Sequence, residues 1–158
     1  MQPGQLRLRY VVSGGIENVR IPTPMIPSRA DELWKHTCFE VFVMGASDAY
    51  CELNFAPSAQ WAAYTFGGYR TGMRIAEEVS AVAIATESNS RRLEVRASLA
   101  LERLEMLPSD ADWRLGLSAV IEETNGQKSY WALAHPPGKP DFHHSDCFVL
   151  TLPSASRL

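Results

Sequence analysis

The sequence predicts an all-β fold, an antiparallel β-sandwich of about ten strands with one short helix. Apolar and polar residues alternate in many short runs along the chain, which is the pattern of half-buried strands. Gly, Asn, Ser and Asp recur between these runs at an even spacing that is typical of antiparallel hairpins. Two packed antiparallel sheets, in a jelly-roll-like arrangement, accommodate this number of strands in one domain spanning residues 1–158.

The first half of the chain supplies strands on both sides of a proline-rich connection. Residues 5–13 alternate strictly and predict a strand, and residues 16–21 predict a second, shorter one. Three prolines in segment 22–27 exclude a central strand or a helix there, because proline lacks the donor N–H, so this segment is expected on the surface. Alternation then resumes in four runs that predict a meander, within 38–44, 49–56, 59–66 and 69–75.

The second half adds two hairpins and the helix. Segments 79–87 and 90–98 predict a hairpin across Ser88 and Asn89. Segment 98–107 has helical spacing, with Ser98 as the cap and Pro108 as the stop. Asn125-Gly126 between two alternating runs, 112–123 and 128–135, is a strong hairpin signal. Residues 146–152 predict the last strand.

Composition and charge narrow the class of protein. The net charge is −3 and Lys and Arg do not cluster, which argues against a nucleic-acid surface. No segment is long and apolar enough to predict a membrane span, and the N-terminus lacks the pattern of a secretion signal. Three cysteines at unrelated spacings favour reduced thiols, and hence a cytoplasmic location. The sequence predicts no oligomeric state.

Motifs of known enzymes are absent, so we expect no catalytic residues. Acid–base chemistry by Glu40 or Glu52 beside His36 remains an alternative. His135, His143 and His144 bracket a proline-rich loop, but their spacing matches no metal motif. We therefore predict no metal site.

Aromatic and polar residues in the strands suggest a binding groove. Trp34 and Trp131 offer flat apolar faces on which a sugar ring or another planar ligand can lie. Glu40, Glu52 and Asn54 occupy polar positions within otherwise apolar strands, and a hairpin between 38–44 and 49–56 places them on one face. The alternative is a solvated sheet face with ion pairs across the strands.

A family resemblance joins these observations. The segments DELWKHTCFEVFV, YCELNFAPSAQWAAYTFGGYRTGM and FHHSDCFVLTL resemble the small stand-alone bacterial DOMON-like domains, which are related to carbohydrate-binding module family 9. The resemblance spans about residues 5–152 and implies a β-sandwich with a ligand site on the concave face or rim of one sheet. It implies sugar or haem as the ligand, no catalysis on a sugar bond, and Trp34 and Trp131 as the pair that holds the ring.

We therefore predict a non-enzymatic domain that binds a small carbohydrate or a similar polar ligand without a cofactor. The first alternative is a haem- or metal-binding redox domain, in which Met44 or Met73 would pair with His135 or His143. The second alternative is a protein-interaction domain. The predicted ligand-binding residues are Trp34, His36, Glu40, Glu52, Asn54, Arg70, Trp131 and His135.

Overall fold

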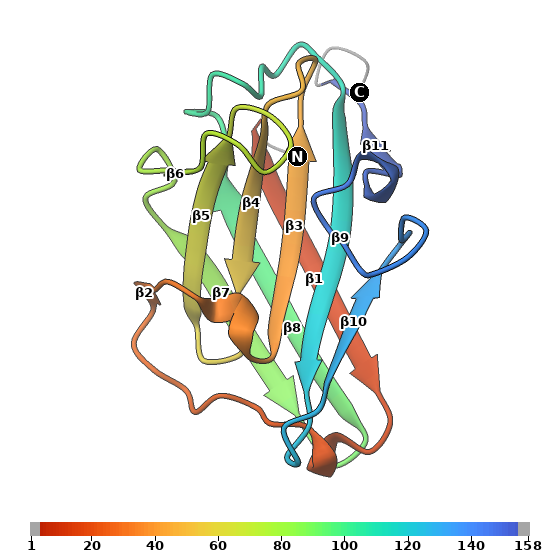
Figure 1. Ribbon diagram of the computed structural model, residues 1–158. Helices are drawn as coiled ribbons and strands as arrows, with labels where there is room; N and C mark the ends of the chain where they lie inside the picture. The colour runs from red at the N-terminus through yellow and green to blue at the C-terminus, as the bar shows by residue number, and fades with distance from the viewer. Residues whose placement is uncertain (1–3, 155–158) are drawn as a thin grey trace.

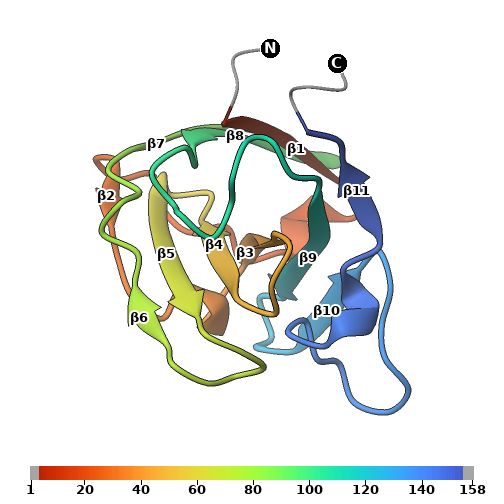
Figure 2. The ribbon, with the colours of Figure 1, turned by 90° about the horizontal axis from the view of Figure 1, so that it is seen from above.

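Two β-sheets pack face to face in the computed structural model, which describes residues 4–154 (Figures 1 and 2). The small sheet has three antiparallel strands in the order β1-β8-β7. These strands are β1 (Gln5–Ser13), β7 (Val82–Ser88) and β8 (Arg92–Ala100). The predicted all-β sandwich is confirmed.

The large sheet has eight strands and carries the candidate site. Its main order is β10-β9-β3-β4-β5-β2, with β11 added to β9 and β6 added to β5. All of its pairings are antiparallel except that between β2 and β5. The strands are β2 (Ser28–Arg29), β3 (Cys38–Met44), β4 (Tyr50–Phe55), β5 (Gln60–Phe66), β6 (Arg74–Ile75), β9 (Trp113–Glu122), β10 (Lys128–Ala132) and β11 (Leu150–Leu152).

The main core fills the space between the two sheets. Strand residues alternate between faces, so Val41, Leu53 and Ala63 of the large sheet point inward together and are at most 1% exposed. Leu6 and Leu99 of the small sheet pack against the same cluster. Burial of this apolar surface is the main stabilising contribution to the sandwich.

The predicted helix at 98–107 is wrong. Ser98 and its two successors continue β8, and the chain then makes tight turns as far as Leu107. The N–H of Leu104 donates to the carbonyl of Leu101 at 3.0 Å, and the N–H of Leu107 donates to the carbonyl of Leu104 at 2.9 Å. The three leucines are buried. Their spacing of three residues is compatible with successive i to i+3 turns as well as with an α-helix, which is why the helix prediction failed.

The predicted strand at 16–21 is also wrong. The 3₁₀ turn η1 (Ile16–Asn18) occupies its first half, and only an isolated bridge from Val19 to Glu123 follows. The predicted hairpins are confirmed by β7 with β8 and by β9 with β10. Gly126 takes the positive φ of 87° that the second turn requires. The proline-rich segment 22–27 lies largely exposed, as predicted.

Loops cover the outer face of the large sheet, opposite the small sheet (Figure 2). They comprise η2 (Leu33–Lys35), the connection 67–73, and the connection after β10, which includes η3 (Ser145–Cys147). Gly116 of β9 allows the last of these to lie close, because a Cβ there would stand 2.8 Å from the carbonyl oxygen of Cys147. These loops form the walls of the candidate site.

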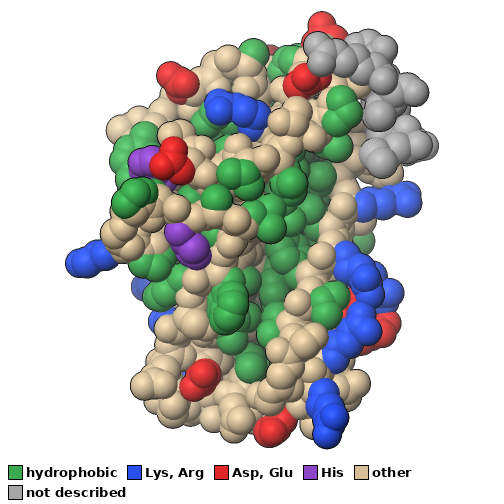
Figure 3. Space-filling model, turned by 90° about the vertical axis from the view of Figure 1, so that its right-hand side faces the viewer, with side chains coloured by type: hydrophobic (Ala, Val, Ile, Leu, Met, Phe, Trp, Pro, Cys, Tyr) green, Lys and Arg blue, Asp and Glu red, His purple; other side chains and the backbone are tan. Residues whose placement is uncertain are grey.

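The remaining surface is mixed. Figure 3 shows the side of β10 and β11, with Lys and Arg gathered along one flank and apolar side chains visible beside them. On the small sheet, Arg9, Arg92 and Arg96 surround Glu94. Within residues 4–154, no helix has the length and apolar character needed to cross a membrane.

Candidate functional site

The floor of the candidate site consists of polar side chains on the outer face of β3, β4 and β9. Glu40 lies opposite both Asn54 and Ser118, and Glu52 belongs to the next cross-strand pair on the same face, opposite Phe42. The exposed fraction of Glu40 is 2%, that of Glu52 is 5%, and Asn54 is fully buried. Strand register therefore brings two carboxyl groups and an amide together beneath the loops.

A cleft of about 510 Å³ opens above this floor. The η2 turn, the connections after β5 and β10, and β10 itself contribute the walls. Aromatic and ionisable side chains make up most of the lining. The aromatic lining residues are Trp34, Phe42, Phe66, Tyr130 and Phe142, and the ionisable ones are Lys35, Glu40, Glu52, Arg70, Lys128 and His143.

Trp34 is held in place by its neighbours on the sheet. Its ring lies half-buried, with an edge contact to Tyr64 at a centroid distance of 5.9 Å. The Tyr64 hydroxyl donates to the Asp31 carboxylate just before the η2 turn. The indole thus packs against the outer face of the sheet and also lines the cleft.

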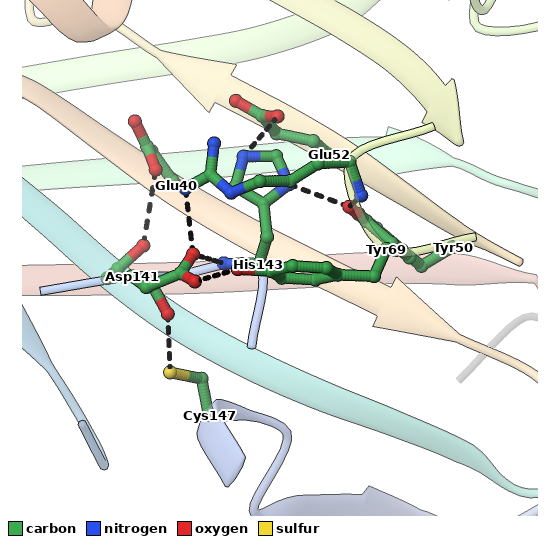
Figure 4. A network of polar contacts seen from close by, with 9 residues as sticks. Glu40, Tyr50, Glu52, Tyr69, Asp141, His143 and Cys147 are labelled. Carbon is green, nitrogen blue, oxygen red and sulfur yellow. Dashed lines mark hydrogen bonds and ion pairs between the residues drawn. The ribbon is translucent and has the colours of Figure 1, made fainter. Parts of the chain in front are cut away.

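Asp141 fastens two of the covering loops to each other (Figure 4). Its carboxylate accepts hydrogen bonds from the Arg70 guanidinium at 2.7 Å, from the Tyr69 hydroxyl, and from the His143 backbone N–H at 3.2 Å. Its carbonyl oxygen accepts from the Cys147 thiol at 3.2 Å. The pKa of Asp141 is lowered because the hydrogen bonds from Tyr69 and Arg70 outweigh its desolvation.

Arg70 adopts an uncommon backbone conformation at this junction, with φ of 52° in the left-handed region. Its backbone N–H donates to the Tyr50 hydroxyl at 3.2 Å. This hydrogen bond and the ion pair with Asp141 hold the residue in a conformation that a non-glycine residue rarely adopts. Arg70 is thus fixed at the cleft wall, with its guanidinium already paired.

His143 links the wall to the floor. Its Nδ1 lies 2.7 Å from the Tyr50 hydroxyl, and its Nε2 lies 3.6 Å from the Glu52 carboxylate. Burial of the ring, and secondarily the nearby Arg70 charge, lower the pKa of His143 to about 4. The ring is therefore neutral at pH 7. The Tyr50 hydroxyl accepts a hydrogen bond from the Arg70 N–H, so we infer that it donates its own proton to His143 Nδ1. The proton of the neutral imidazole ring then lies on Nε2, which faces Glu52.

The two floor carboxyls have strongly raised pKa values. Desolvation and then the Glu52 charge raise the pKa of Glu40 to about 8, although the hydrogen bond from Ser118 opposes this. Desolvation also raises the pKa of Glu52 to about 7, opposed by the hydrogen bond from Asn54. Near neutral pH the floor holds about one proton between two carboxyls, which makes it sensitive to a ligand's charge and donors.

Four of the eight predicted residues line the cleft, namely Trp34, Glu40, Glu52 and Arg70. A fifth, Asn54, lies beneath them and donates from Nδ2 to Glu52 Oε1 at 3.1 Å. The predicted strand at the start of 69–75 is absent, so Arg70 reaches the cleft from a loop. Glu52 faces the cleft rather than bulk water.

Three predicted residues lie outside the lining. Trp131 is 63% exposed and donates from Nε1 to Ser129 Oγ, whereas its neighbour Tyr130 pairs with Val120 and lines the cleft. His36 is exposed and lies 2.7 Å from the Glu122 carboxylate. His135 is exposed and contacts only the rim, with its ring 6.1 Å from that of Phe142.

The sequence carried a signal for some of the residues that were missed. Alternation through the Asn-Gly hairpin places Tyr130, not Trp131, on the face of Val120 and hence of Glu40. Alternation through β4 and β5 likewise places Phe66 with Tyr50. Asp141 and His143 come from an irregular loop, in which no periodicity indicates where a side chain points.

Of the four residues named for the haem alternative, Met73 and His143 line the cleft, whereas Met44 and His135 do not. Met44 is buried, and its sulfur lies 2.8 Å from an Arg114 nitrogen. Both ring nitrogens of His143 face protein groups, and His135 lies outside the cleft. Among the described residues, no group of three or more His, Cys, Asp or Glu side chains is arranged to hold a metal ion.

Comparison with known proteins supports the fold. The structure is similar to the crystal structure of a "putative carbohydrate-binding protein" from Bacteroides uniformis ATCC 8492, with a TM-score of 0.67 and 14% sequence identity. The match covers 94% of this chain and 72% of that one. No protein-family model and no curated protein matches the chain. At 14% identity the likeness concerns the fold alone, so the resemblance to DOMON-like domains stays a prediction.

Proposed function

We propose that this chain is a non-enzymatic binding domain for a carbohydrate or a similar polar ligand, held in the cleft on the outer face of the large sheet. The observation that carries the proposal is the combination of aromatic walls with a floor of two buried carboxyls and an amide. An apolar sugar face packs against aromatic rings, while each sugar hydroxyl needs both a donor and an acceptor.

The size and preorganisation of the cleft favour a small ligand. Its volume of about 510 Å³ lies within the roughly 300–1,000 Å³ of small-molecule sites. The Asp141 contacts and the ring contacts of Trp34 fix the walls before a ligand arrives, which lowers the entropic cost of binding. The sugar-binding description of the structural neighbour supports the same ligand class.

Calorimetric titration of the purified chain with a panel of mono- and disaccharides tests this proposal. We expect at least one saccharide to bind, and Trp34→Ala to weaken its binding about 10-fold or more, since an aromatic contact is lost. Trp131→Ala is the matched control and should leave the affinity unchanged, because Trp131 lies outside the cleft. Absence of binding across the panel, or an equal loss in both variants, would contradict the proposal.

A second candidate follows from the raised pKa values at the floor. A carboxyl with a pKa of about 8, such as that of Glu40, is protonated at pH 7 and meets the requirement for a general acid in glycoside cleavage. Incubation with p-nitrophenyl glycosides separates the two candidates. Turnover that Glu40→Gln abolishes would establish a hydrolase, and its absence alongside saccharide binding would establish a binding domain.

A further inference from the structure

Hydrogen-bond acceptors outnumber donors at the floor of the cleft. Glu40 receives one hydrogen bond from Ser118, at 3.3 Å, and Glu52 receives one from Asn54, at 3.1 Å. The Asn54 Oδ1 atom is buried and has no hydrogen-bond partner among the described residues. A buried acceptor without a donor is costly, so this floor is incompletely satisfied by the protein itself.

No cationic side chain hydrogen-bonds to either carboxyl within residues 4–154. The Arg70 guanidinium is paired with Asp141, and its charge is only a minor influence on the pKa of Glu52. Lys35 is paired with Glu32 at 2.8 Å, and Lys128 lies exposed at the rim. The neutral His143 ring is 3.6 Å from Glu52, which is beyond hydrogen-bonding distance. Near neutral pH the two carboxyls share about one proton, so about one negative charge of the floor is left without a cationic partner.

The walls above the floor also suit a cation. Phe42 lies opposite Glu52 in the strand register, and Phe66, Trp34 and Tyr130 also line the cleft. Aromatic faces attract ammonium groups, and they do so more strongly where water is excluded. An ammonium supplies three donors and one positive charge, which matches a surplus of acceptors and of negative charge.

We propose that the ligand of this cleft carries a protonated amine, as an amino sugar does, and that its ammonium group binds between Glu40 and Glu52. This inference rests on the proposed function and specifies the ligand class for the same site. The hydroxyl groups of such a ligand face the rim, where Arg70, Lys35 and Lys128 line the cleft. Binding ionises the floor and releases the proton that it held, so the uptake of a cation is accompanied by proton release.

Titration calorimetry with matched sugars tests the inference. The probes are glucosamine, galactosamine and mannosamine, each beside its parent hexose and its N-acetyl derivative, at pH 7 in two buffers of different ionisation enthalpy. We expect at least one amine to bind about 10-fold or more tightly than both of its neutral counterparts. Its apparent binding enthalpy should differ between the buffers because a proton is released.

Two variants locate the charge that is recognised. Glu40→Gln and Glu52→Gln keep the side-chain shape and should reduce the preference for the amine to within about threefold. Glu17→Gln removes an exposed carboxylate outside the cleft and should retain the full preference. Thermal unfolding of each variant verifies that it is folded, and proton release by the unmodified chain tests the inference without any variant.

The outcomes separate the inference from the proposed function. If a parent hexose or an N-acetyl derivative binds as tightly as its amine, the inference is wrong and the saccharide-binding proposal stands. If these sugars fail to bind but a neutral saccharide of the wider panel binds, the conclusion is the same. If nothing in either panel binds, both proposals fail. An amine preference that survives in both glutamine variants would also overturn the inference.

Discussion

The inner face of β3 and β4 packs against the small sheet, whereas their outer face is covered by loops. Every residue of both strands is buried, so the two faces exclude water about equally. The inner face carries Val41, Val43 and Leu53 in a continuous apolar core. The outer face combines Phe42 and Tyr50 with Glu40, Glu52 and Asn54.

The difference shows what each kind of cover permits. The small sheet turns apolar side chains toward the large sheet. The inner face of the large sheet must therefore be apolar and closely packed as well. Loops also bring polar side chains such as Asp141 and His143, and they leave a cleft between them. Polar groups can therefore be kept on a buried face where loops cover it, and a ligand can reach them there.

The largest expected effect is on the inner face. Leu53→Ala creates a cavity beside residues that cannot easily move, and should lower the free energy of unfolding by about 3 kcal/mol. Urea unfolding followed by tryptophan fluorescence measures this change. Saccharide affinity per folded molecule should be unchanged. A comparable loss of affinity in the folded variant would mean that the two faces are not independent.

Removing a carboxyl from the outer face should raise the free energy of unfolding, whereas Leu53→Ala lowers it. The pKa of Glu40 is about 8 in the folded protein, against an ordinary value of 4.5, so the folded state binds more protons than the unfolded state between these pH values. The stability of the unmodified protein should fall as the pH rises through that window. Glu40→Gln should abolish much of the fall and be the more stable of the two proteins at pH 8.5.

Urea unfolding at pH 5 and pH 8.5 checks this sign. At pH 5 the difference between the variant and the unmodified protein should be much smaller, because pH 5 lies near the lower end of that window. The exposed Glu17→Gln control should show the pH dependence of the unmodified protein. A Glu40→Gln variant that is less stable at pH 8.5 would mean that the carboxylate is stabilised in the fold.

A smaller effect is expected from the loop cover itself. Tyr50→Phe deletes the hydroxyl that contacts His143 Nδ1 and accepts from the Arg70 N–H, and should cost about 1–2 kcal/mol. Tyr130→Phe is the matched control, since that side chain is exposed, its hydroxyl makes no hydrogen bond within residues 4–154, and the change should cost much less. Amide hydrogen exchange should show faster exchange in segment 67–73 for Tyr50→Phe. Equal effects of the two variants would remove Tyr50 from its proposed role.

The fold and the side-chain directions could be predicted from the sequence where apolar and polar residues alternate regularly. Alternation correctly predicted the sandwich and the shared face of Glu40, Glu52 and Asn54, because side-chain direction in a strand follows from residue number alone. The same rule, applied across the Asn-Gly turn, would have replaced Trp131 with Tyr130. The helix predicted at 98–107 is wrong because the spacing of the leucines in 101–107 fits successive turns as well as a helix.

The walls of the cleft could not be predicted in this way. Asp141 and His143 are placed by hydrogen bonds between loops that are far apart in sequence. Arg70 lines the cleft from a loop, in a left-handed backbone conformation that no local pattern indicates. Tertiary contacts, rather than propensity, determine these positions.

The most direct test of the outer-face cleft is the response of the four tryptophan indole N–H signals in a proton–nitrogen correlation spectrum during titration with the saccharide that binds most tightly. Trp34 lines the cleft, whereas Trp61 and Trp113 are buried in the core between the sheets. Trp131 lies outside the cleft and donates a hydrogen bond to Ser129. We expect the Trp34 signal to shift with ligand concentration while the other three stay in place. A shift of the Trp131 signal with the Trp34 signal unmoved would contradict the account.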